Sequence, residues 1–79
     1  MTDEQILAAL TDICRQVFAD DSIVMTLDTT AEDVEGWDSF NHINILVAVE
    51  MRFGIKFHTA EVEELRNVGQ LVQLIRAKV

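Results

Sequence analysis

The chain has 79 residues, of which 14 are acidic and 6 are basic, so its formal net charge is −8. This length predicts one domain, residues 1–79, with a modest core. The charge excludes a binder of nucleic acid or of an anionic membrane surface and favours a basic protein partner. With one cysteine, an acidic N-terminus unlike a signal sequence and no membrane-length apolar run, we expect a soluble cytoplasmic protein.

The first predicted element is an amphipathic helix over residues 3–18. Thr2 and Gln5 have the spacing of a capping box, in which each side chain satisfies a free backbone N–H group of the first turn. Cys14 lies on the apolar face of this helix, so we expect it to fill core rather than to react. The apolar residues that recur at helical spacing are Ile6, Leu10, Ile13 and Val17.

A long polar segment over residues 20–37 follows and is predicted to be a loop. Seven acidic residues fall between Asp20 and Asp38, and no lysine or arginine occurs between Gln16 and Met51. Loops of this length inside a small domain are often functional. We expect its isolated apolar residues to attach it to the core: Ile23, Met25, Leu27 and Val34.

The next segment is predicted to be a helix that starts at a cap formed by Asp38 or Ser39 and stops at Gly54. Residues 43–49 also have the β-branched composition of a buried strand, but the distance between the cap and the glycine favours a helix of about fourteen residues. Nearly all of this helix is expected to be buried, apart from an outward stripe formed by Asn41, Asn44, Ala48 and Arg52.

Two further helices complete the chain. Thr59 is expected to cap a short acidic helix that contains Glu61, and Asn67 with Gln70 opens a last helix with apolar residues at helical spacing. The predicted fold class is all-α: a small four-helix bundle with a long loop between helices 1 and 2 and a short third helix.

Enzymatic and metal chemistry find little support in the residue pattern. Asp38, Ser39 and His42 are the residue types of a hydrolase triad, but Asp38 adjoins Ser39 and cannot orient the far side of the imidazole. The two histidines and Cys14 lack metal-ligand spacing. A phosphate ester on Ser39 would be stabilised by the free N–H groups and the dipole of the helix, although the serine also fits a plain capping role.

The flanking residues favour the phosphate-bearing role through a resemblance. Asp38-Ser39-Phe40, Glu50, the sequence of residues 53–57 and that of residues 67–69 together resemble the acyl carrier protein family over essentially the whole chain. The resemblance implies a non-catalytic carrier with 4′-phosphopantetheine on Ser39, installed from coenzyme A with Mg²⁺ by a phosphopantetheinyl transferase. It also implies that Asp38 assists this attachment, and that acyl groups are held as thioesters on the arm and not on Cys14.

Departures from the family pattern bear on partner choice. Phe40 replaces the usual leucine, and Asn41 and Asn44 stand where carriers of fatty acid synthesis usually place acids. We therefore expect a monomeric, specialised carrier for fatty acid, lipid or polyketide-type synthesis whose partner enzymes present basic docking surfaces. The residues expected to take part in partner recognition are Trp37, Phe40, Asn41, Asn44 and Glu61.

Two alternatives stay open at this stage. The chain also fits an aminoacyl or peptidyl carrier, which differs in cargo only. It fits as well an acidic helical interaction module without a prosthetic group, for which Ser39 would be dispensable.

Overall fold

The computed structural model describes residues 1–79 and consists of helices joined by loops, with no strand. The prediction of an all-α fold with four α-helices, a long first loop and a short third helix is confirmed, and the alternative of a buried strand over residues 43–49 is wrong. The elements are α1 (Asp3–Val17), the 3₁₀ turn η1 (Ala31–Asp33), α2 (Ser39–Phe53), α3 (Thr59–Glu63) and α4 (Val68–Lys78).

The ends of the helices follow the capping chemistry of the sequence. The Thr2 side chain accepts from the N–H of Gln5, and the Gln5 side chain accepts from the N–H of Thr2, so the expected capping box starts α1. Asn67 caps α4 by accepting from the N–H of Gln70 at 2.9 Å. The short helix α3 differs slightly, because His58 rather than Thr59 holds its N-cap position.

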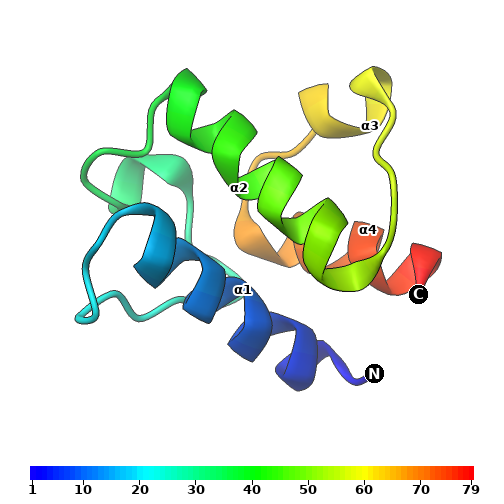
Figure 1. Cartoon of the computed structure of the whole chain (residues 1–79), viewed down its shortest axis with the longest axis horizontal. Coiled ribbons are helices and arrows are strands. Elements are labelled where there is room, and N and C mark those ends of the chain that lie inside the picture. The colour runs from blue at the N-terminus through cyan, green and yellow to red at the C-terminus, as the bar shows by residue number, and fades with distance from the viewer.

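Helix α1 packs against two other helices. It runs antiparallel to α2 on one side and packs against α4, while α3 and its connections lie beside α2 (Figure 1). The core contains Cys14, as predicted, and residues from three helices and the loop. Its members are Ile6, Leu10, Ile13, Cys14, Met25, Ile45, Leu46, Val49, Val68, Leu71, Val72 and Ile75.

The long α1–α2 loop is attached to two helices by backbone carbonyls. The carbonyl of Ile23 accepts from Nε of Arg15 at 2.8 Å. The carbonyls of Leu27 and Thr29 accept from the N–H groups of residues 69 and 68, each at 2.8 Å. Of the apolar side chains expected to anchor the loop, only Met25 is fully buried, whereas that of Leu27 is exposed. Ile23 is half-buried and packs against the core as well. The loop is therefore attached both by hydrogen bonds to its carbonyls and by apolar contacts.

Asn44 and Arg52 of the expected outward stripe are exposed, but the expectation that nearly all the rest of α2 is buried is wrong. Its buried side chains are those of Ile45, Leu46 and Val49, and large apolar residues also occupy its outward face. Most residues of this helix are apolar, so the polar residues did not mark the solvent side as they do in an ordinary amphipathic helix. The exposed apolar residues of α2 are Phe40, Ile43, Val47 and Met51.

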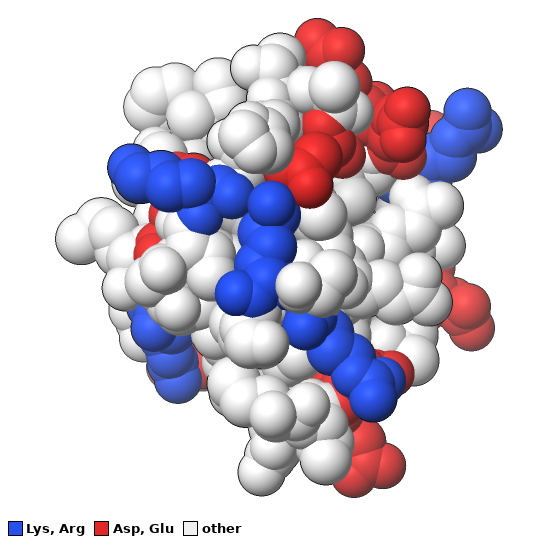
Figure 2. Space-filling view, turned by 90° about the vertical axis from the view of Figure 1, so that its right-hand side faces the viewer, with Lys and Arg blue, Asp and Glu red and all other residues white.

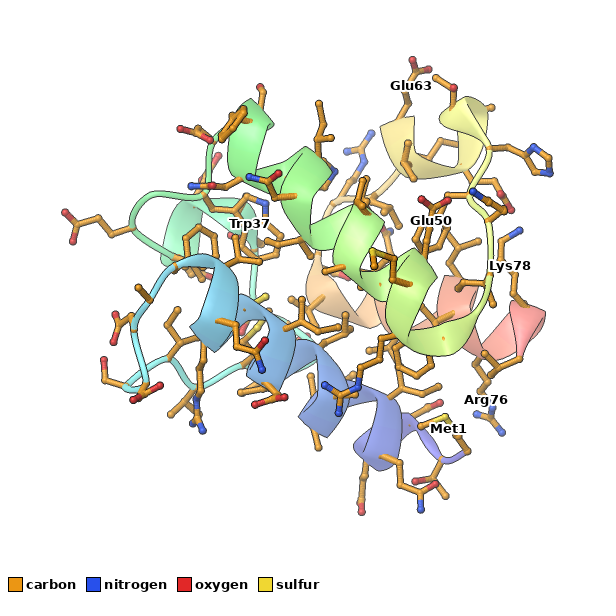
Figure 3. All side chains as sticks on the ribbon, in the orientation of Figure 1. Met1, Trp37, Glu50, Glu63, Arg76 and Lys78 are labelled. Carbon is orange, nitrogen blue, oxygen red and sulfur yellow. The ribbon has the colours of Figure 1, made fainter.

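The two ends of α2 are fixed differently. Gly54 ends the helix in the left-handed conformation, with φ of 66°, which a residue without Cβ adopts at little cost. Glu50 then points toward the α2–α3 connection (Figure 3), where its carboxylate accepts from the N–H of Phe57 at 2.8 Å.

None of the helices is long and apolar enough to cross a membrane.

Candidate functional site

Ser39 is the first residue of α2, and its side chain is exposed to solvent. Asp38 holds the N-cap position, where one carboxylate oxygen accepts from the N–H of Asn41 at 2.9 Å. The first intrahelical donor is the N–H of His42, so the N–H groups of Ser39 and Phe40 have no acceptor within the helix. A hydroxyl at this position therefore stands beside unpaired donors at the positive end of the helix dipole.

Hydrogen bonds to the carbonyl of Gly36 hold the turn that precedes α2. Gly36 has φ of 88°, a conformation that favours glycine, and its carbonyl accepts from the N–H of Asp38 at 3.0 Å. The same carbonyl accepts from the side-chain amide of Asn41 at 2.8 Å. The side chain of Asn41, which we expected to recognise partners, thus holds the turn that leads into Ser39.

Trp37 and His42 pair beneath the start of α2. The indole N–H of Trp37 donates to Nδ1 of His42 at 3.1 Å, so the proton of a neutral imidazole is on Nε2. The indole ring also packs against Phe18, with ring centroids 6.0 Å apart, and its side chain points under the ribbon of α2 (Figure 3). These contacts suit a side chain that closes the loop against the core, whereas the sequence led us to expect Trp37 to take part in partner recognition.

An open hollow lies beside Ser39 and is lined by residues from η1, the turn and the first half of α2. A second hollow shares three of these residues and extends toward the start of α4. No side chain covers the Ser39 hydroxyl, so the site fits a bulky flexible group linked there through phosphate. The residues around the first hollow are Ala31, Trp37, Asp38, Ser39, His42 and Ile43.

Charge is segregated along the molecule. The seven acids between Asp20 and Asp38 belong to the loop that leads into Ser39, and five of the six cations follow Met51 in sequence. Lysine and arginine side chains form a band across the side of the molecule on which α4 ends (Figure 2). The end that presents Ser39 is therefore the more negative one.

The remaining candidates from the sequence lie away from the serine or are already engaged. The carboxylate of Glu61 accepts from the N–H of His58 at 2.9 Å and forms an ion pair with Lys78 at 3.0 Å. Cys14 is buried, and this burial raises the pKa of its thiol to about 11. No group of three or more histidine, cysteine, aspartate or glutamate side chains is arranged to hold a metal ion.

Sequence reasoning missed two features of the site. It considered His42 only as a member of a triad or as a metal ligand, although Trp37 and His42 occupy the N′ and N4 positions, whose side chains commonly pack across a helix start. It also placed the exposed face of α2 on the asparagines, because all the apolar residues were assigned to the core. The contact between Trp37 and His42 could have been found from their spacing in the sequence. The exposed face of α2 could not, because it depends on how α2 is rotated against α1.

Comparisons with known proteins agree with this geometry. A family model described as the phosphopantetheine attachment site matches residues 5–75. The acyl carrier protein of Rhodococcus erythropolis is 31% identical over 75 residues, covering 95% of this chain and 82% of that protein. The acyl carrier protein of Exiguobacterium sibiricum is 29% identical over 79 residues, covering all of both chains.

A solved structure gives the same result. The solution structure of a holo acyl carrier protein from Geobacter metallireducens is 49% identical to this chain and superposes with a TM-score of 0.87. The similarity covers 92% of this chain and 84% of that one.

A four-helix fold with an uncovered serine at the start of α2 and a matching family model defines the class of phosphopantetheine-bearing carrier domains. Within this class, the chain belongs to the acyl carrier protein family. It is a non-catalytic carrier whose prosthetic group is 4′-phosphopantetheine, and the prediction of this function and cofactor is confirmed.

Proposed function

We propose that Ser39 is the residue that carries 4′-phosphopantetheine, through a phosphodiester to its hydroxyl. The observation that carries this proposal is the exposure of Ser39 at the first position of α2, beside N–H groups without an intrahelical acceptor. When bound, the group supplies a terminal thiol on which acyl groups are held as thioesters. The role of this chain is to present that thiol at the end of a rigid helix.

Asp38 is proposed to assist the attachment. Oδ1 of its carboxylate is occupied by the N–H of Asn41, and Oδ2 accepts no hydrogen bond within the chain. The capped oxygen fixes the orientation of the carboxylate, which leaves the other oxygen facing solvent beside Ser39. That oxygen is suited to position the Mg²⁺ or the serine hydroxyl when the transferase, with coenzyme A, docks.

Among the other partner-recognition candidates, Phe40 and Asn44 remain the best supported. Phe40 is 73% exposed and adjoins Ser39, and Asn44 is also exposed on α2. Trp37, Asn41 and Glu61 make internal hydrogen bonds that hold the loop, the turn and α3, so we propose supporting roles for them.

The negative charge around Ser39 supports the proposal that the partner enzymes have basic docking surfaces. A basic patch around the entrance of an enzyme would attract the acidic loop and so orient the carrier with Ser39 leading. Such steering raises the rate of encounter and leaves the complex weak enough to dissociate after transfer. We propose that these partners are cytoplasmic transferase and acyl-transferring enzymes of fatty acid, lipid or polyketide-type synthesis, with this chain as a specialised carrier.

The attachment proposal is tested by intact-protein mass. The purified chain is incubated with coenzyme A, Mg²⁺ and a broad-specificity phosphopantetheinyl transferase, and Ser39→Ala and Ser22→Ala are treated in parallel. Ser22 is the only other serine and is exposed in the loop, which makes it a matched control. The wild type and Ser22→Ala should each gain one phosphopantetheine, and Ser39→Ala should gain none. A gain on Ser39→Ala would disprove the assignment.

A further inference from the structure

The imidazole of His42 has one ring nitrogen that is bonded and one that is free. Nδ1 accepts from the indole N–H of Trp37 at 3.1 Å, so the proton of the neutral ring is on Nε2. The Nε2–H group donates to no acceptor within the chain, and no buried nitrogen or oxygen atom of a side chain lacks a partner. This free donor is therefore open to solvent, although the ring as a whole is half-buried.

His42 and Ser39 line the same open hollow beside the start of α2. His42 follows Ser39 by three positions, and side chains at this spacing are neighbours on a helix surface. Helical side chains also lean toward the N-terminus, so the imidazole lies back over the first turn, where it meets Trp37. The ring is thus placed within reach of a group bonded to the Ser39 hydroxyl.

We infer that the Nε2–H group of His42 binds a phosphate oxygen of the prosthetic group, and that Trp37 positions the imidazole for this contact. The inference rests on the proposed attachment at Ser39. A phosphodiester there places an anionic acceptor directly after the serine hydroxyl, and hydrogen bonds to charged acceptors are the strong ones. His42 is then a binding residue, and Trp37, which acts through the ring, is a positioning residue.

No other side chain around this hollow offers a free donor. Ile43, the second neighbour of Ser39 at helical spacing, is apolar. Trp37 already donates its only side-chain N–H to the imidazole. The carboxylate of Asp38 has the same sign of charge as a phosphodiester and repels it. His42 therefore supplies the one side-chain donor that these residues leave for the phosphate.

Two kinds of donor then hold the phosphodiester. The free backbone N–H groups of Ser39 and Phe40 lie at the helix start, and the imidazole N–H belongs to the residue one turn further along. Contacts from both restrict rotation about the bonds of the Ser39 side chain, so the arm leaves the helix in a preferred direction. The Trp37–His42 hydrogen bond thus links the closure of the α1–α2 loop to the direction of the arm.

The test compares the apo and holo forms of the ¹⁵N-labelled chain by NMR at about pH 8, where a histidine side chain is ordinarily neutral. The holo form is made with coenzyme A, Mg²⁺ and a phosphopantetheinyl transferase. Solvent exchange of the His42 Nε2 proton should slow by about tenfold or more on conversion to the holo form, because a hydrogen bond to a charged group protects it. His58, exposed in the α2–α3 connection, is the internal control and should not change.

A second measurement follows the phosphorus atom. The ³¹P chemical shift of the holo protein should differ from its value in urea, and His42→Leu should remove most of that difference. His42→Gln, whose amide keeps an N–H donor, should restore part of it. Trp37→Phe keeps an aromatic ring and removes the donor to Nδ1, so its shift should fall between those of wild type and His42→Leu. His58→Leu, the matched control, should follow the wild type.

The outcomes separate the imidazole contact from the attachment itself. If the group is on Ser39 but the His42 proton exchanges as fast as in the apo form, the contact is wrong and the attachment stands. The same holds if folded His42→Leu keeps the wild-type ³¹P shift. A wild-type shift in Trp37→Phe would remove the positioning role of Trp37. If the group is not on Ser39, both proposals fail. The exchange measurement needs only the wild type, so it decides even where a variant does not fold.

Discussion

The indole N–H of Trp37 donates to the imidazole Nδ1 of His42 at 3.1 Å, which links the residue two places before Ser39 to the fourth residue of the same helix. This bond crosses the start of α2 on its inner side, while Asp38 caps the helix on the outer side. Together they fix the direction in which the chain enters the helix, and with it the direction in which Ser39 is presented.

Removing the acceptor of this bond should destabilise the fold. His42→Ala leaves the half-buried indole N–H of Trp37 without its partner, and we expect a loss of about 1–2 kcal/mol in the free energy of unfolding. Urea unfolding followed by the fluorescence of Trp37, the only tryptophan, measures it. His58→Ala changes an exposed histidine and should have little effect; equal losses in the two variants would contradict this account.

Gly69 should tolerate alanine poorly, although it lies in a helix. A Cβ at this position would stand 2.7 Å from the carbonyl oxygen of Leu27, which the N–H of Gly69 already holds at 2.8 Å. Helix propensity alone predicts that Gly69→Ala stabilises by about 0.5–1 kcal/mol, whereas the crowding predicts a loss of about 1–3 kcal/mol. Chemical denaturation decides the sign, with exposed Gln73→Ala on α4 as the control. A more stable Gly69→Ala would show that the loop carbonyl moves aside without cost.

Cys14 should stay unmodified while the fold is intact. Burial raises the pKa of its thiol to about 11, so at about pH 8 only about one molecule in a thousand has the reactive thiolate, and that group is also shielded. Iodoacetamide should therefore label the thiol of the prosthetic group in the holo protein and leave the apo protein unlabelled until urea is added. Mass spectrometry reads both states. Rapid labelling of the folded apo protein would contradict the buried position, and Cys14→Ala confirms the site of any label.

Glu61 should make the attachment of α3 sensitive to acid. The N–H of His58 and then the ammonium of Lys78 lower the pKa of this carboxyl below its usual value. A lowered pKa in the folded state means that its contribution is present at neutral pH, above the pKa of the unfolded chain. It is lost as the pH falls through the folded value.

Glu61→Gln should accordingly lower the melting temperature at pH 7 by a few degrees, of the order expected for an ion pair at the surface, and the difference from wild type should shrink as acid protonates this carboxyl. Glu63→Gln, a neighbouring exposed acid on α3, is the control and should follow the wild type at pH 7 and in acid. A difference between Glu61→Gln and wild type that persists in acid would place its origin outside this carboxylate.

The boundaries of α1, α2 and α4 were predictable because they depend on local chemistry. Thr2, Asp38, Gly54 and Asn67 act within a few residues of their own position, and each stands where the sequence indicated. The position of Ser39 at a helix start followed from the same reasoning, and its function followed from the family resemblance.

The solvent face of α2 was not predictable, because it is set by packing between elements distant in sequence. Ile43 and Ile45 are the same residue type, yet one is 60% exposed and the other 1%. Only the direction in which α2 meets α1 distinguishes them. The hydrogen bonds that attach the loop could not be predicted either. They use backbone carbonyls, which every residue has whatever its side chain.

The two hydrogen bonds from residues 68 and 69 to the loop carbonyls also bear on how the molecule is assembled. They give the first turn of α4 its acceptors from residues about forty positions earlier in the chain, so this turn is completed only once the loop has arrived. We therefore expect the α1–α2 loop and the first turn of α4 to open and close as one unit. Hydrogen exchange should find the amides of Val68 and Gly69 protected together or open together.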